Sequence, residues 1–81
     1  MKTRRDEIRY EQMEYPLYST DWYYLEGRRA RALGCLISGL RQPGIHTGNE
    51  SNFEITQGMY QMMVMGWKDE DAMYELPDHG I

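Results

Sequence analysis

Apolar side chains recur at intervals of three and four residues between about residues 20 and 41, and this spacing predicts an amphipathic helix. The cluster Ser19-Thr20-Asp21 offers good N-cap residues at its start. Gln42-Pro43-Gly44 stops the helix, because proline cannot continue it. The apolar stripe consists of Trp22, Leu25, Leu33, Leu36, Ile37 and Leu40.

A second helix is predicted over about residues 52–69, after a loop over residues 42–51. Ser51 and Glu54 have the spacing of a capping box at its start. The cluster Asp69-Glu70-Asp71 then begins a short C-terminal turn that ends before Pro77. Because no segment alternates apolar and polar residues over a sustained length, we expect no strands.

Residues 1–20 are predicted to form an N-terminal arm or short helix, which Tyr15-Pro16 ends. The expected fold class is therefore all-α, with two main helices (about 20–41 and 52–69) packed as a helical hairpin. Residues 21–81 would form this two-helix core with a loose C-terminal tail. The 81 residues leave room for one domain only.

Charge divides the chain into two unlike halves. Residues 1–41 carry a net charge of +2 and residues 42–81 a net charge of −6, within a total of −4. An acidic chain needs a local basic patch to contact nucleic acid. Arg28, Arg29 and Arg31, joined by Arg41, form such a candidate patch for phosphates or carboxylates. A solvated helix face, with its charge balanced by acidic neighbours, is the alternative.

Two further groups of residues are candidates for binding. Asp69, Glu70 and Asp71 either meet a basic partner or form a solvated cluster. Trp22 and Tyr23 belong to the tyrosine-rich stretch 15–24, which either packs inward or faces a target. Methionines of the second helix fit either a core or a subunit interface, and a thin core would favour a homodimer.

Nothing in the sequence assembles a catalytic site. His46 and His79 lie in a predicted loop and tail, without the spacing of a metal site. We therefore expect neither an enzyme nor a cofactor or metal. A single cysteine, Cys35, cannot form an internal disulfide, and no apolar run is long enough to span a bilayer. These features predict a cytoplasmic protein with no membrane partner.

The segment Glu26–Gly34 resembles the first helix of the ribosome modulation factor family, through Gly27, Ala30 and Gly34. Asn52-Phe53 stands where the family has an Asn/Cys-Pro-Tyr segment, and Gly66-Trp67 matches its late Gly-Trp pair. The resemblance implies two helices that meet along a seam of small residues covered by Trp67. It also implies binding to ribosomal RNA and ribosomal proteins. The chain departs from the basic family in its pI near 5.0.

Two functions follow as hypotheses. The first is a non-enzymatic binding protein that docks on the ribosome or on another large nucleoprotein. The alternative is a phage- or plasmid-encoded inhibitor of a host defence or nucleic-acid-processing complex, which would act through the acidic C-terminal half.

Overall fold

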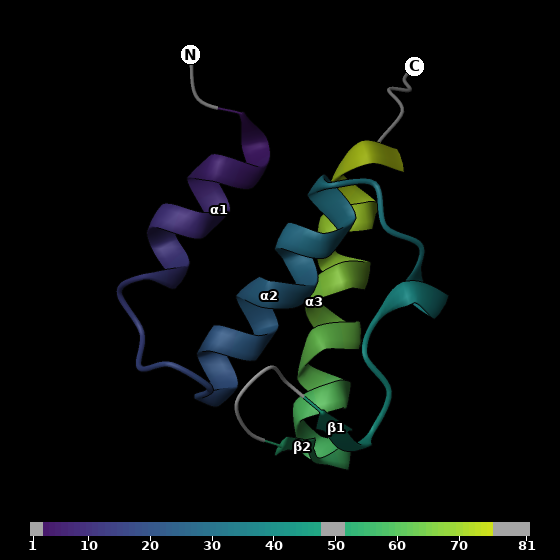
Figure 1. Cartoon of the computed structure of the whole chain (residues 1–81). Coiled ribbons are helices and arrows are strands. Elements are labelled where there is room, and N and C mark those ends of the chain that lie inside the picture. The colour runs from purple at the N-terminus through teal and green to yellow at the C-terminus, as the bar shows by residue number, and fades with distance from the viewer. Residues whose placement is uncertain (1–2, 48–51, 76–81) are drawn as a thin grey trace.

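The computed structural model describes residues 3–47 and 52–75. Along the chain come α1 (Arg4–Gln12), α2 (Thr20–Ala32), the 3-10 turn η1 (Ile37–Gly39), β1 (Gly44–Thr47), β2 (Asn52–Ile55) and α3 (Gln57–Glu75). In Figure 1, α2 lies between α1 and α3, and the strands lie near the start of α3. The described chain is therefore α+β, and the expected all-α class is wrong.

The N-terminal segment contains a capped helix. Thr3 and Asp6 form a capping box, in which each side chain bonds the backbone N–H of the other. Ile8 is the apolar anchor of α1 and is only 1% exposed. A helix of nine residues is marginal alone, so packing against α2 stabilises α1.

Helix α2 begins where the sequence predicts, since the Ser19 hydroxyl accepts a hydrogen bond from the Trp22 N–H. It ends at Ala32, well before residue 41, and the predicted bounds 20–41 are wrong. Gly34 has φ +90°, and the next N–H, of Cys35, bonds the Ala30 carbonyl. This Schellman motif ends the helix at a glycine that tolerates left-handed backbone. Leu36, assigned to the apolar stripe, is consequently 72% exposed.

The expected absence of strands is also wrong. β1 and β2 pair antiparallel, with Gly44 opposite Ile55 and Thr47 opposite Asn52. Burial alternates along β2, where Phe53 is half-buried and Ile55 is 3% exposed. A four-residue strand shows too little alternation to be recognised in the sequence. Glu54 lies in this strand, so it does not belong to a helical capping box, and Ser51 lies outside the described residues.

Helix α3 starts at Gln57, later than predicted, and continues to Glu75. The Thr56 hydroxyl accepts a hydrogen bond from the Met59 N–H and so caps the first turn. The prediction of a separate C-terminal turn is therefore wrong. The cluster Asp69-Glu70-Asp71 lies inside α3, where its side chains face other helices.

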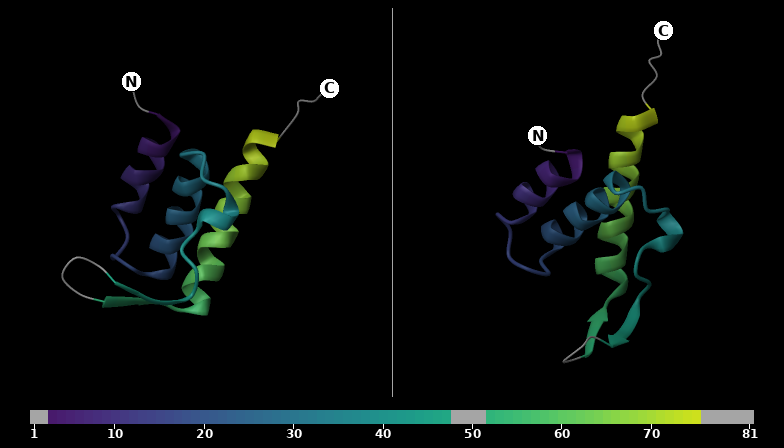
Figure 2. Two further views of the ribbon diagram at one scale, coloured as in Figure 1. Left: turned by 45° about the vertical axis from the view of Figure 1, so that its right-hand side comes forward. Right: turned by 45° about the horizontal axis from the view of Figure 1, so that its top comes forward.

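Helices α2 and α3 run in the same direction, because the connecting chain returns along them before α3 begins. Figure 1 and both views of Figure 2 show the two helices leaving the same end of the molecule side by side. The predicted helical hairpin, in which the helices would run in opposite directions, is wrong. The chain returns from the end of α2 to the start of α3 through η1 and the two strands, where the sequence predicted a short loop.

The contact line between α2 and α3, here called the seam, depends on two glycines. A Cβ at Gly27 would overlap the Met63 carbonyl, and one at Gly66 would overlap the Tyr24 carbonyl. The backbones therefore touch. One end of the seam borders the core cluster of Tyr23, Leu40, Ile55 and Met63. No helix in the described ranges is long and apolar enough to cross a membrane.

Candidate functional site

The buried carboxylate of Glu70 joins all three helices at the far end of the seam. Glu70 is 0% exposed. Its oxygens accept hydrogen bonds from Arg4 Nε at 2.7 Å and from Arg28 Nε at 3.1 Å. The Tyr74 hydroxyl donates a further bond at 3.0 Å. We call these four residues the Glu70 network.

The pKa of Glu70 reflects this arrangement. Burial alone would raise the pKa, because it disfavours the charged form. The hydrogen bonds from Arg4, Arg28 and Tyr74 outweigh that effect and lower the pKa of Glu70 to about 2. The carboxylate is therefore ionised at neutral pH and satisfied within the fold.

A second ion pair lies beside the network. Arg31 Nε donates to Asp71 Oδ1 at 2.6 Å, and its guanidinium lies 4.5 Å from the centre of the Tyr74 ring. The Tyr24 hydroxyl donates to Asp69 and accepts a hydrogen bond from Arg28 Nη1. The basic and acidic patches considered from the sequence thus face each other. Arg28 and Arg31 bind the acidic cluster of the same chain.

The other predicted binding residues lie elsewhere. Arg29 points toward α1, and its closest carboxylate is Glu26, at 3.9 Å. Arg41 lies over the Phe53 ring, 5.2 Å from its centre. Trp22 is half-buried, and Tyr23 is 5% exposed. The structure therefore separates the four candidate arginines, since Arg28 and Arg31 lie on the seam and Arg29 and Arg41 lie away from it.

These aromatic rings line an open cavity of about 370 Å³ between α2, the η1 segment and β2. Its walls include Tyr18, Trp22, Tyr23 and Phe53, with Glu26 and Arg41 among them. The Tyr18 and Trp22 rings meet edge to face with centres 5.4 Å apart.

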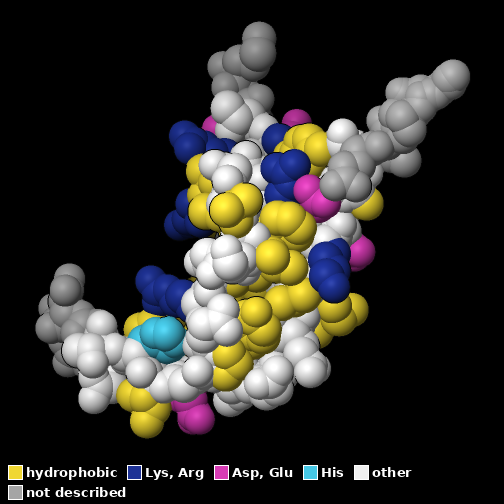
Figure 3. All heavy atoms as spheres, turned by 90° about the vertical axis from the view of Figure 1, so that its right-hand side faces the viewer, with side chains coloured by type: hydrophobic (Ala, Val, Ile, Leu, Met, Phe, Trp, Pro, Cys, Tyr) yellow, Lys and Arg dark blue, Asp and Glu magenta, His cyan; other side chains and the backbone are white. Residues whose placement is uncertain are grey.

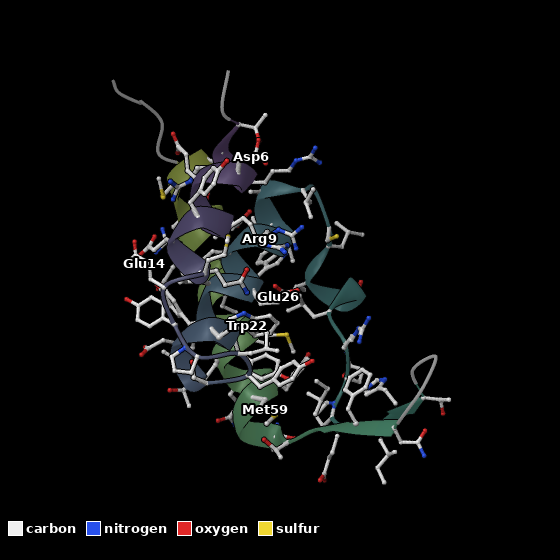
Figure 4. The ribbon with its side chains drawn as sticks, turned by 60° about the vertical axis from the view of Figure 1, so that its left-hand side comes forward. Asp6, Arg9, Glu14, Trp22, Glu26 and Met59 are labelled. Carbon is white, nitrogen blue, oxygen red and sulfur yellow. The ribbon has the colours of Figure 1, made fainter. Side chains whose placement is uncertain are left out.

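A second cavity, of about 390 Å³, opens between α1 and α2. Arg9, Tyr15 and Arg29 line it, and it shares Trp22 and Glu26 with the first cavity. Figure 4 shows Arg9, Glu26 and Trp22 following one another along this side of the molecule. The two cavities adjoin at Trp22 and Glu26, and together they are here called the groove.

The carboxylate of Glu26 is held at the centre of the groove by a buried amide. Gln12 is 2% exposed, and its Nε2 donates to Glu26 Oε1 at 2.8 Å and to the Trp22 carbonyl at 3.1 Å. Both donors of the amide are thereby used. Gln12 consequently fixes Glu26 relative to the tryptophan, while the Glu26 side chain stays 33% exposed.

Tyr18 has an unusual backbone conformation at the edge of the groove. Its φ is 67°, in the left-handed region that a residue with a side chain rarely adopts. The ring is nevertheless 59% exposed. A strained residue whose side chain is largely solvated points to a role for that side chain beyond core packing.

The residues assigned to helix packing occupy different places. Gly27 and Gly66 lie in the seam, and Ala30 packs against the core cluster. Trp67 is half-buried, and its Nε1 donates to the Cys35 carbonyl at 2.8 Å. Gly34 is the exception, since a Cβ there would meet nothing within 4 Å. Its assignment to the seam is wrong, because its positive φ serves the end of α2.

The remaining candidates give no assembled reaction site. Over residues 3–47 and 52–75, no three His, Cys, Asp or Glu side chains gather as a metal-binding group. His46 Nε2 bonds the Gln42 carbonyl at 2.7 Å, and its ring stacks on Phe53. Cys35 is exposed as a free thiol, and His79 lies outside the described residues.

Hydrophobic side chains also reach the surface away from the groove. Figure 3 shows them gathered in the middle of the face that carries η1 and α3, with Lys and Arg side chains along its margins. Leu36 is 72% exposed and Met65 53%. These side chains add apolar contact area to the outside of the molecule.

Comparison of the chain with protein-family models, with curated proteins and with solved structures finds no match. The class of protein must therefore be argued from the groove and the seam themselves.

The sequence did not indicate Arg9 or Glu26 as residues of the groove, and it indicated Tyr18 only as part of the stretch 15–24. Arg9 belongs to the N-terminal segment, which no pattern connects with Trp22. Glu26 precedes three arginines, so its place in the sequence indicates a residue that balances their charge. The one usable signal was Ser19 as an N-cap, because it places Trp22 and Glu26 on one face of α2, four residues apart.

Proposed function

We propose that this chain is a non-enzymatic binding protein that docks through the groove on a large nucleoprotein partner, with the ribosome as the first candidate. The groove carries the proposal, because aromatic rings and the arginines Arg9, Arg29 and Arg41 lie together on an open surface. Aromatic residues and arginine are the residue types that contribute most to macromolecular interfaces.

The contacts of the seam favour the groove as the binding site over the arginine patch that the sequence indicates. Arg28 and Arg31 bind Glu70 and Asp71, so using them for phosphates would require these ion pairs to break. Arg9 and Arg41 form no ion pair with a carboxylate among those found in the described residues. Their guanidinium groups are available to a partner.

The resemblance to ribosome modulation factors adds support of a different kind. Gly27 and Gly66, two residues that carry the resemblance, are the two positions where α2 and α3 backbones touch. A ribosomal partner thus remains the first to test. A cytoplasmic location belongs to the same proposal, and the free thiol of Cys35 is compatible with a reducing compartment.

The alternative of an inhibitor that acts through its acidic half has less support. Glu70 is buried and Asp71 is paired with Arg31. A basic groove of a host protein would meet little free acidic surface on this part of α3. Charge complementarity with a basic partner would therefore have to come from other residues.

Sedimentation with purified bacterial ribosomes through a sucrose gradient tests the proposal. We expect the wild-type chain to travel with the ribosomal peak at low salt. The combined change Arg9→Ala, Arg29→Ala and Arg41→Ala should return it to the top of the gradient. The control removes two exposed cations outside the groove, Arg5 and Lys68, and should leave binding intact. A wild-type chain that never leaves the top of the gradient refutes the ribosomal proposal.

A further inference from the structure

The groove has a polar centre between aromatic walls, and this arrangement restricts what it can bind. Trp22 and Glu26 are common to both cavities, and Tyr18 stands at the edge with its ring 59% exposed. A flat ligand that enters beside these rings meets the Glu26 carboxylate at its edge. An aliphatic side chain would add no hydrogen bond to that carboxylate, whereas a ligand with a donor at its edge would add one.

Nucleic-acid bases match this pairing of ring and carboxylate. An unpaired base stacks on aromatic side chains with its π face and presents hydrogen-bonding groups at its edge. The amino group of cytosine donates to a carboxylate, which is its usual acidic partner in proteins. Glu26 Oε1 already accepts from Gln12. The Glu26 side chain lines both cavities and is 33% exposed, so its carboxylate has room for a further hydrogen bond.

The charges around the groove match a strand of nucleic acid. Arg9 and Arg29 line the half between α1 and α2, and Arg41 lines the other half. Three cations thus surround one carboxylate. A base at Glu26 would have a phosphate on either side along the strand, and each phosphate would meet an arginine. A single acidic peptide side chain would use only one of these cations.

We infer that the groove is a binding site for an unpaired RNA base with an amino group, held between aromatic rings and Glu26. The flanking phosphates contact Arg9 and Arg29 on one side and Arg41 on the other. Gln12 acts as a positioning residue, because it fixes the carboxylate that reads the base. This inference rests on the proposed function and narrows it to single-stranded RNA.

Short oligoribonucleotides of cytidine and of uridine provide the matched probes. They differ at the base edge, where cytosine has an amino group and uracil a carbonyl. Binding is measured by the fluorescence of Trp22 in the Trp67→Phe variant. Because this variant has one tryptophan, any change in its fluorescence comes from the groove. We expect oligocytidine to bind about tenfold more tightly, as a hydrogen bond to a charged group would provide.

Two variants separate the parts of the site. Glu26→Gln should remove the preference for cytidine while keeping binding, because the rings and arginines remain. Changing Arg9 or Arg41 to alanine should weaken both probes equally and lower the slope of log affinity against log salt by about 0.7. Glu14→Gln makes the same chemical change at an exposed carboxylate that lines neither cavity, and it serves as the control for Glu26→Gln.

The inference is overturned if both oligonucleotides bind equally, or if neither binds while the chain still sediments with ribosomes. In that second case the proposed function survives without it. If an acidic, aromatic-containing peptide quenches Trp22 and neither RNA does, the groove takes a protein segment instead. If the wild-type chain prefers oligocytidine but does not sediment with ribosomes, the ribosomal partner is refuted and the base site is not.

Discussion

The seam and the groove use the same residue type in opposite ways. Arg28 donates to the buried Glu70 at 3.1 Å, whereas its chain neighbour Arg29 faces α1, with its closest carboxylate 3.9 Å away. One residue along a helix is a rotation of about 100°. Arginines adjacent in sequence therefore belong to separate sites. Changes in the seam should therefore affect stability, and changes in the groove should affect binding.

The largest effect is expected from a single methyl group in the seam. Gly66→Ala would place a Cβ against the Tyr24 carbonyl, and no flexible side chain is there to move aside. The helices must separate, at a cost of at least about 3 kcal/mol in the free energy of unfolding. Urea denaturation followed by circular dichroism measures this. Gly58→Ala is the control, since its Cβ would meet only Thr56 Oγ1 at 3.9 Å. Equal stability of both variants would contradict the close approach.

The next largest effect concerns the buried charge. Glu70→Gln would leave Arg4 and Arg28 facing a neutral amide, which should reduce the free energy of unfolding by about 3 kcal/mol. Glu54→Gln makes the same chemical change at an exposed position on β2 and should have little effect. Chemical denaturation of the two variants compares them directly. A Glu70→Gln protein as stable as the Glu54→Gln protein would disprove the network's role.

Acid should weaken the seam through the same carboxylate. The pKa of Glu70 is lowered in the fold from 4.5 to about 2. A lowered pKa means that the ionised form stabilises the native state. This contribution is complete above about pH 4.5 and is lost as the pH falls toward 2. Thermal unfolding between these values should show a fall in Tm that is shallower in Glu70→Gln. If Tm falls with pH equally in the wild-type chain and in Glu70→Gln, other groups cause the acid sensitivity.

Small effects on stability are expected from the groove arginines. Arg9→Ala together with Arg29→Ala should change the free energy of unfolding by no more than about 0.5 kcal/mol, because the one ion pair found for them in the described residues is the long contact of Arg29 with Glu26 at 3.9 Å. The same pair of changes should reduce ribosome sedimentation. A marked loss of stability would mean that the groove arginines hold α1 against α2.

The smallest net effect should come from Tyr18→Gly. Glycine adopts φ 67° freely, which relieves strain of about 1 kcal/mol. The lost ring contacts with Trp22 and Tyr23 offset that gain, so we expect a change within about 0.5 kcal/mol. Denaturation curves and binding of oligocytidine should be measured together. If Tyr18→Gly binds oligocytidine as tightly as the wild-type chain does, Tyr18 is not part of the binding site.

Local signals in the sequence predicted part of the fold well. Ser19 marks the start of α2, because an N-cap acts within a single turn. Gly34 misled the prediction, since a glycine at the end of a helix and one inside it look alike beside apolar residues. The strand Asn52–Ile55 was missed because four residues carry too little pattern.

The site was less predictable, because its contacts join distant parts of the chain. Arg4 and Glu70 are 66 residues apart, and Arg28 and Glu70 are 42 apart. No periodicity relates such positions, so the two charge clusters looked like independent binding surfaces. Gln12 could not be recognised as a positioning residue for Glu26 either, since a glutamine at the end of a helix is ordinarily solvated.

The contact between Arg4 and Glu70 has a consequence for how the chain matures. It closes a loop of nearly the whole described sequence, and closing long loops costs entropy that only later contacts recover. During synthesis, α1 can complete this contact only after the last turns of α3 have left the ribosome exit tunnel. Until then, α1 is held only by its contacts with α2, such as the hydrogen bonds from Gln12 to Trp22 and Glu26.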